Sequence, residues 1–273
     1  MGFFSRLFGN ESTKNKEELS KNASSKNIIE TMLMTAEVAI NKEDYAMAAQ
    51  IYNDILKLES NATAQCNLGS LYAQGKGVNQ DFKEAAYWFR QAELSGDERA
   101  EKLCLKCSLD FIHQNFDIKD SEQLYTDMVD FIKYVYPSTN DVNLEVCRTL
   151  YGIAGNHFNN QEYASAAKLF RAAGEFGNDG YSQNYLAVLY NVGRGLEQND
   201  LAALYWFDKA IDNGAADVAQ QDRDGILNAY KENFSPEEFS KIILKLVEWC
   251  QTGSEDVPKD IAKSIYWREI TEN

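Results

Sequence analysis

The sequence contains one unit of about 118 residues written twice. When residues 68–96 are placed over residues 186–214 without a gap, twelve of the 29 positions are identical. The same offset also aligns residues 43–52 with residues 161–170. The identities fall mainly on apolar residues and glycines, among them Leu68 and Leu186, Tyr72 and Tyr190, Gly75 and Gly193, Trp88 and Trp206. Repetition at a fixed period is the sequence signature of an array of stacked structural units.

Within each copy the apolar residues recur with the period of a helix. Leu68, Leu71 and Tyr72 stand at positions i, i+3 and i+4, and no alternating β-branched pattern occurs. Gly75 suits the left-handed position that ends a helix, and Asp81, followed by glutamate three residues later, is typical of a helix start. The pattern predicts an all-α fold made of successive antiparallel helix pairs.

Composition excludes several classes of protein. The 273 residues are 44% hydrophobic and 12% aromatic, which is enough to bury a core and too apolar for a disordered chain. There are 42 acidic and 27 basic residues, a net charge of −15, whereas binding to a phosphate backbone needs a basic face. No apolar run approaches the roughly 20 residues that span a bilayer. We therefore expect no nucleic-acid partner and no stable membrane insertion.

The first 26 residues differ from the rest of the chain. Residues 9–26 are polar, and residues 1–26 hold five basic and three acidic residues, which predicts a flexible N-terminal tail. Phe3, Phe4, Leu7 and Phe8 would share one face of a short helix. Such a segment suits a weak membrane contact or docking contact.

Five cysteines and no export signal favour reduced thiols and a cytoplasmic protein. Cys104 and Cys107 form a C-x-x-C, but they lie inside a helical pattern, and a zinc site needs two further ligands that the spacing does not supply. They are interpreted as core residues. The five positions are Cys66, Cys104, Cys107, Cys147 and Cys250.

A search for catalytic groups gives no convergent set. The chain has two histidines, without an obvious nucleophile beside either. Ser165 and Lys168 match the S-x-x-K of serine β-lactamases, but alanine spacing in a helix explains this segment and the companion motifs are lacking. The sequence therefore predicts no enzyme activity, no catalytic residue, no cofactor and no metal site.

The repeated segment resembles the Sel-1-like repeat, a relative of the tetratricopeptide repeat with a longer loop. The resemblance rests on Ala64, Leu68, Gly69, Tyr72, Gly75, Gly77, Val78, Asp81, Ala85, Trp88, Ala92 and Gly96. The second copy departs from the pattern at Ala187, Leu196 and Asn199, and residues 247–267 look like a third, decayed copy. Residues 27–60 and 145–178 look more like ordinary tetratricopeptide repeats.

The resemblance implies a right-handed α-α solenoid that follows the tail. Its expected organisation is a single solenoid over residues 27–273, with homologous halves at 27–144 and 145–262 and a C-terminal capping helix. Such solenoids stack helix pairs into one continuous core. What remains exposed is a curved inner wall suited to recognition.

The resemblance also implies a function. It indicates a non-catalytic scaffold or adaptor that holds a peptide or protein on its concave surface, and the acidic excess favours a basic partner. An immunity or inhibitor protein that neutralises a cognate toxin or enzyme is the alternative. Helix phase, by analogy with tetratricopeptide geometry, suggests groove-facing residues: Cys66, Ser70, Gln74, Asn184, Val188 and Asn191.

Overall fold

A computed structural model describes residues 26–115, 121–136, 142 and 144–272, and the predicted tail up to residue 25 lies outside them. In this part of the chain every regular element is a helix, thirteen in all. The all-helical fold predicted from the sequence is confirmed. The helices are 26–41, α2 Tyr45–Leu58, α3 Ala62–Gln74, α4 Phe82–Leu94, α5 Ala100–Asn115, α6 Ser121–Val135, α7 Leu144–Asn159, α8 Tyr163–Phe176, α9 Gly180–Val192, α10 Asp200–Asp212, α11 Ala216–Asn233, α12 Pro236–Thr252 and α13 Ile261–Glu272.

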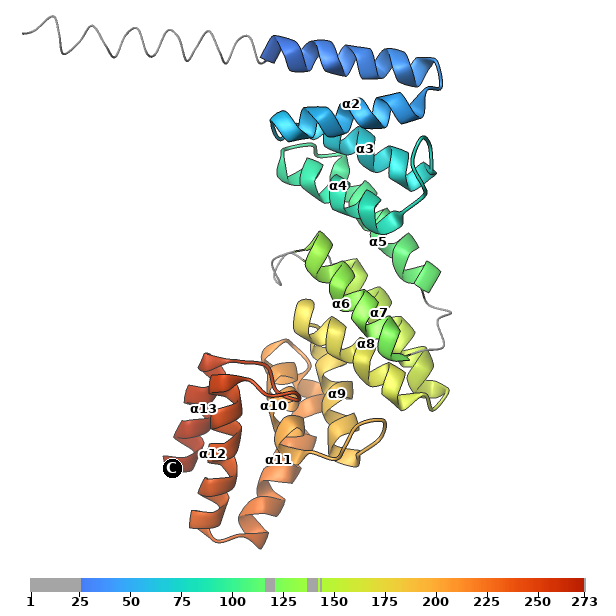
Figure 1. The fold of residues 1–273 in the computed structure, drawn as a ribbon. Helices are drawn as coiled ribbons and strands as arrows, with labels where there is room; N and C mark the ends of the chain where they lie inside the picture. The colour runs from blue at the N-terminus through green and yellow to red at the C-terminus, as the bar shows by residue number, and fades with distance from the viewer. Residues whose placement is uncertain (1–25, 116–120, 137–141, 143, 273) are drawn as a thin grey trace, which may run out of the picture. The chain divides into compact units, whose positions relative to one another are not determined.

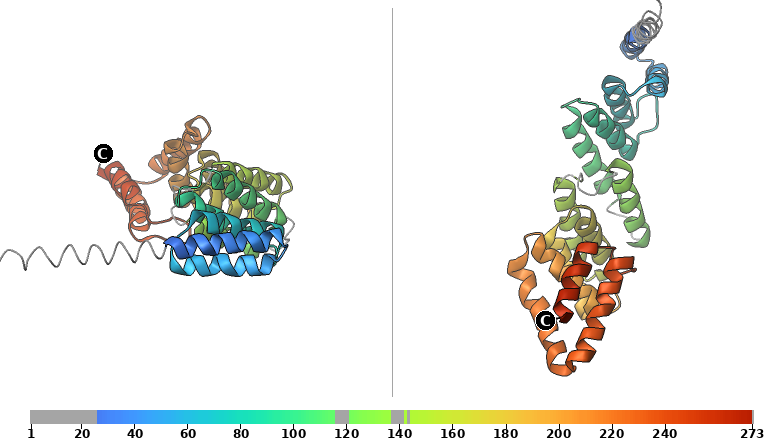
Figure 2. Two further views of the ribbon diagram at one scale, coloured as in Figure 1. Left: turned by 90° about the horizontal axis from the view of Figure 1, so that it is seen from above. Right: turned by 90° about the vertical axis from the view of Figure 1, so that its left-hand side faces the viewer.

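The helices form two compact units, Met1–Phe111 and Ile112–Asn273, called unit 1 and unit 2 below. In unit 1, helix 26–41, α2, α3 and α4 follow one another in chain order (Figure 1). In unit 2, α7 packs on α8, α8 on α9, α9 on α10, and α12 on α13 (Figures 1 and 2). Sequential antiparallel pairing of helices is therefore confirmed.

Local sequence sets the ends of the repeat helices. The side chain of Asp81 accepts a hydrogen bond from the backbone N–H of Glu84 at 3.0 Å, which satisfies one of the free donors at the start of α4. Asn199 does the same for Ala202 at the start of α10, at 3.1 Å. Gly75 ends α3 with φ +64°, a left-handed conformation that costs glycine little.

The second loop glycine is required by close packing. A Cβ on Gly77 would lie 2.2 Å from the carbonyl carbon of Tyr45, at the first residue of α2. Gly195 is in the same position in unit 2, where a Cβ would lie 2.4 Å from the backbone nitrogen of Ala164. Each loop therefore rests directly on the start of the second helix of the preceding pair.

The core combines alanine with large aromatic residues. Small alanines let neighbouring helices approach closely, and the aromatic rings fill the space between them. Trp206 is 1% exposed, and Trp88 packs against the core of unit 1, as the repeat pattern predicts. Other residues buried to below 2% exposure are Phe89, Phe170, Tyr190, Phe207 and Trp267.

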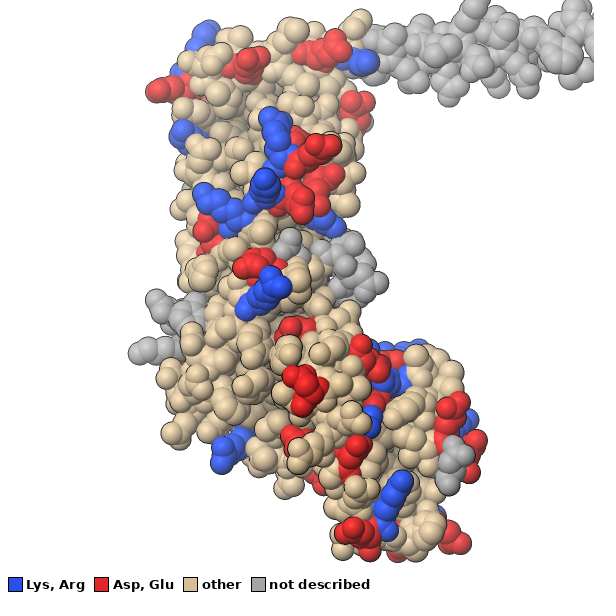
Figure 3. All heavy atoms as spheres, turned by 180° about the vertical axis from the view of Figure 1, so that it is seen from behind, with Lys and Arg blue, Asp and Glu red and all other residues tan. Residues whose placement is uncertain are grey.

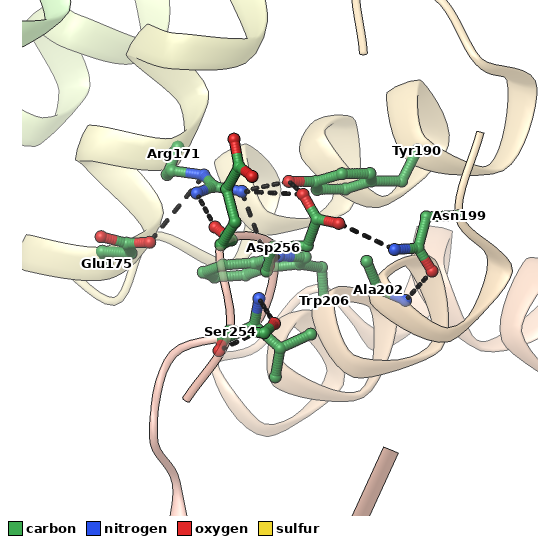
Figure 4. A network of polar contacts seen from close by, with 10 residues as sticks. Arg171, Glu175, Tyr190, Asn199, Ala202, Trp206, Ser254 and Asp256 are labelled. Atoms are coloured by element: carbon green, nitrogen blue, oxygen red, sulfur yellow. Dashed lines mark hydrogen bonds and ion pairs between the residues drawn. The ribbon is translucent and has the colours of Figure 1, made fainter. Parts of the chain in front are cut away.

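In unit 2, Asp256 holds the loop of the third repeat against three earlier elements (Figure 4). Its carboxylate accepts hydrogen bonds from the hydroxyl of Tyr190 at 2.9 Å and from Nδ2 of Asn199 at 2.8 Å. Arg171 donates to the Tyr190 hydroxyl and lies 4.0 Å from the Asp256 carboxylate. Nε1 of Trp206 donates to the Asp256 carbonyl oxygen at 3.0 Å. The loop is thus fixed to α8, α9 and α10.

All five cysteines are buried thiols. Burial raises the pKa of Cys107, Cys147 and Cys250 to about 12 each, because a thiolate is poorly solvated in an apolar interior. Burial also raises the pKa of Cys66. The C-x-x-C therefore lacks the acidic, accessible thiol of a redox pair.

Replacing Asp256 by alanine should lower the free energy of unfolding by about 1–2 kcal/mol, because the buried Tyr190 and the half-buried Asn199 lose their acceptor. Urea denaturation followed by tryptophan fluorescence measures this, since three of the four tryptophans lie in unit 2. Glu255→Ala is the matched control, because only its backbone oxygen takes part in the network. Equal stability of the two variants would contradict the role given to the Asp256 carboxylate.

The thiols should resist alkylation in the folded protein. Because burial raises the pKa of Cys107, Cys147 and Cys250 to about 12, these three thiols remain protonated as pH rises from 7 to 9, where an ordinary thiol near 8.5 becomes reactive. Mass spectrometry after iodoacetamide treatment should find little labelling at either pH and five labels in 6 M guanidinium. Rapid native labelling of Cys107 or Cys147 would refute this expectation.

Candidate functional site

Unit 1 contains a groove of about 720 Å³ between helix 26–41, α2 and α3. Recessed surfaces of this size are typical of sites that take a small molecule or a peptide side chain. The lining residues are Glu30, Leu33, Met34, Glu37, Ile40, Asn41, Tyr45, Tyr52, Thr63, Asn67, Ser70, Leu71, Gln74 and Lys76.

Helix 26–41 supplies one wall of the groove. Glu30, Leu33, Met34 and Glu37 follow the spacing i, i+3, i+4 and i+7, so they share one helix face. The two glutamates are exposed and stand about 10 Å apart along the helix axis. Met34 lies on this wall and is 67% exposed. The wall therefore offers two carboxylates on either side of an apolar surface.

The floor is more polar. Nδ2 of Asn67 donates a hydrogen bond to the hydroxyl of Tyr52 at 3.1 Å, and Tyr52 is only 3% exposed. Burial raises the pKa of Tyr52, so its hydroxyl keeps its proton at neutral pH. At one end, Nζ of Lys76 lies 5.1 Å from the centre of the Tyr45 ring, a cation–π distance.

The equivalent place in unit 2 is filled with aromatic rings. At the offset of the repeat, Asn67 becomes Tyr185 and Tyr52 becomes Phe170, and these two rings stack at 4.8 Å with 10° between their planes. Phe158, in place of Ile40, packs edge-on against Tyr185 at 5.3 Å. Tyr151 and Tyr163 complete the cluster. A smaller recess of about 300 Å³ remains at one end, lined by Arg148, Tyr151, Asp179 and Tyr181. The same helical frame thus gives a large groove in one copy and a mostly filled one in the other.

The charges of the groove also belong to unit 1 alone. The residues equivalent to Glu30 and Glu37 are Arg148 and Gly155. On the face drawn in Figure 3, lysines and arginines lie in small groups beside aspartates and glutamates. The pair of carboxylates that lines the groove of unit 1 is therefore absent from the equivalent positions of unit 2.

The structure brings together two of the six residues predicted to face a groove. Ser70 and Gln74 both line it. Cys66 is 7% exposed and is not among the lining residues. Its carbonyl accepts a hydrogen bond from Oγ of Ser70 at 3.0 Å. The other three, Asn184, Val188 and Asn191, lie half-buried on α9 in unit 2.

Sequence reasoning missed Glu30, Glu37 and Asn67. The signal for Asn67 was present, because the repeat pairs this small amide with Tyr185. An exchange of a large aromatic ring for a short polar side chain at a packing position leaves space. No comparable sequence signal distinguishes Glu30 and Glu37, because acidic residues are common throughout this chain.

The described residues offer little for catalysis or for metal binding. None of the described groove residues is a histidine or a cysteine. No group of three or more His, Cys, Asp or Glu side chains with the arrangement of a metal site occurs in the part of the chain that the structure describes. Within the same residues, no helix has the length and apolar composition needed to cross a membrane.

Two solved structures are similar to the chain, both with low identity. A crystal structure of a Sel1 repeat protein from Oxalobacter formigenes is 19% identical over 84% of this chain and 77% of its own, with a TM-score of 0.30. A protective antigen present in uropathogenic Escherichia coli strains, described as displaying an SLR fold, is 20% identical with a TM-score of 0.29. That match covers 92% of this chain but only 55% of the antigen. No curated protein matches the chain significantly.

The Sel1 repeat family model matches residues 62–97, 180–214 and 248–267. The first two matches contain α3 with α4 and α9 with α10, including both loops with close-packed glycines. The third contains the end of α12, the loop of Asp256 and the start of α13, where the sequence predicts a decayed copy. These three segments of the chain are therefore Sel1 repeats.

Proposed function

We propose that this protein is a non-catalytic scaffold that binds a peptide segment of a protein partner in the groove of unit 1. The observation that carries the proposal is the difference between the two copies of the repeat. At this position unit 2 has stacked aromatic rings and a recess of only about 300 Å³, whereas unit 1 has a groove of about 720 Å³ lined by carboxylates, amides and hydroxyls. In helical repeat proteins the core lies between stacked helices, so the side chains on such a surface are available for recognition.

The groove favours a peptide with a large apolar side chain next to a lysine or arginine. Burying one such apolar side chain against Leu33, Met34 and Ile40 would contribute about 1.5–3 kcal/mol. A cation between Glu30 and Glu37 adds less, on the order of 0.2–1 kcal/mol, because these carboxylates are exposed. The apolar side chain would set most of the affinity, and the charges would set selectivity and association rate.

The proposal includes a reducing compartment such as the cytoplasm. Five buried thiols, three of them with pKa values near 12, support it because they fit a chain that does not depend on disulfides. The net charge of −15 supports a basic protein segment and not a nucleic acid as the partner.

Filling the groove should abolish binding and leave the fold intact. Peptides are first selected from a random 12-residue phage library on the whole protein, then measured by fluorescence anisotropy. Asn67→Tyr should weaken their binding at least tenfold, because the new ring can stack on Tyr52 as Tyr185 stacks on Phe170. Gln50→Tyr, exposed on α2 outside the groove, is the control. Failure to select peptides, or equal binding to both variants, would reject the proposal.

Binding of a selected basic peptide should depend on salt. Raising NaCl from 0.05 to 0.5 M should slow its association several-fold, because screening shortens the range of the carboxylate field. Stopped-flow fluorescence measures this rate. Glu30→Gln with Glu37→Gln should remove much of the dependence, whereas Glu43→Gln with Glu59→Gln, exposed outside the groove, should keep it. If the salt effect is the same in both double variants, the carboxylates of Glu30 and Glu37 are not the source of the attraction between the peptide and the protein.

A further inference from the structure

The N-terminal segment of this chain has the chemistry that the groove favours. Residues 3–8, Phe-Phe-Ser-Arg-Leu-Phe, place Arg6 among four large apolar side chains. This segment lies outside the described residues. Over residues 1–26, basic residues exceed acidic ones, while the whole chain carries a charge of −15. Arg6 and its apolar neighbours thus complement the carboxylates and exposed apolar side chains of the groove.

The segment also starts close to the groove along the chain. Helix 26–41 begins at residue 26, and Glu37 lies about 16 Å further along its axis. Seventeen residues, the length of 9–25, can extend to about 55 Å, and a random coil of this length has a root-mean-square span of about 20–25 Å. The connection is therefore long enough to fold back and short enough to give an effective concentration on the order of 1 mM.

Met34 adds an independent reason to expect an occupant. It lines the groove, yet 67% of its surface is exposed beside Leu33 and Ile40, which are themselves only partly buried. An apolar segment laid along this wall would remove that surface from water. The acidic side chains at both ends of the wall favour a segment with a central cation.

We propose that residues 3–8 occupy the groove of the same chain when no partner is bound, with Arg6 between Glu30 and Glu37 and with the Phe and Leu side chains on Leu33, Met34 and Ile40. This inference rests on the proposed function, because it assigns the same groove. A partner peptide must then displace the segment. If the segment alone binds the groove with a dissociation constant of about 0.1 mM, the tethered segment, at an effective concentration of about 1 mM, would weaken partner binding about tenfold.

Disulfide trapping in the full chain tests the position of the segment. To keep Arg6 and both glutamates, Ser5→Cys is combined with Asn41→Cys in the groove or with Gln50→Cys, exposed on α2 outside it. The native thiols are buried, so the introduced pair should react first. At low protein concentration, the Asn41 pair should form an intramolecular disulfide at least tenfold faster than the Gln50 pair. Equal rates, or mainly intermolecular disulfides, would overturn the proposal.

Two further variants separate this inference from the proposed function. Asn67→Tyr should remove the preference for Asn41 in the trapping experiment, and trapping that is unchanged would overturn occupancy of the groove. Arg6→Glu should increase the affinity of a library-selected peptide three- to tenfold, and an unchanged affinity would reject competition by the segment. If selected peptides bind in the groove and trapping shows no preference, the segment proposal fails alone. If no library peptide binds, the proposed function fails, whatever the trapping experiment shows.

Discussion

The structure depends on the close approach of each repeat loop to the helix pair before it. Gly77 and Gly195 lie so near the starts of α2 and α8 that even a methyl group would collide with backbone atoms. This contact fixes where one pair ends and the next begins. The alanines and aromatic rings of the core can then interdigitate at helix–helix distances set by that contact. The side chains on the inner helix faces take no part in this contact, so they can differ between the two copies of the repeat.

That freedom explains how the same frame supports two different surfaces. In unit 2, Tyr185 stacks on Phe170, and Phe158 closes the edge of the pair. In unit 1, Asn67 and Tyr52 meet through one hydrogen bond and leave a groove. The backbone requirements of the repeat are met in both units, since Gly75 and Gly193 have the same φ of +64°. The residues that set the architecture are therefore not the residues that differ between the two surfaces.

Most of the fold could be predicted from the sequence, because it follows from local rules. Helical period, the left-handed Gly75 and the Asp81 cap are each readable within a few residues. The site could be predicted only in part. Ser70 and Gln74 were found from helix phase, which places both on the face of α3 that meets the groove. Cys66 has nearly the same phase but is buried, since the depth of a side chain depends on neighbouring helices that periodicity does not specify.

The open groove has an energetic consequence for unit 1. An aromatic pair such as Tyr185 with Phe170 contributes about 0.5–1.5 kcal/mol beyond the area it buries, and unit 1 forgoes this at Asn67 and Tyr52. It also leaves Met34 largely in water and keeps Glu30 and Glu37 on the same helix face, where their charges repel weakly. A bound segment that is apolar and positively charged would cover Met34 and would reduce the repulsion between the two glutamates. These features of the surface support the proposal that the groove binds such a segment.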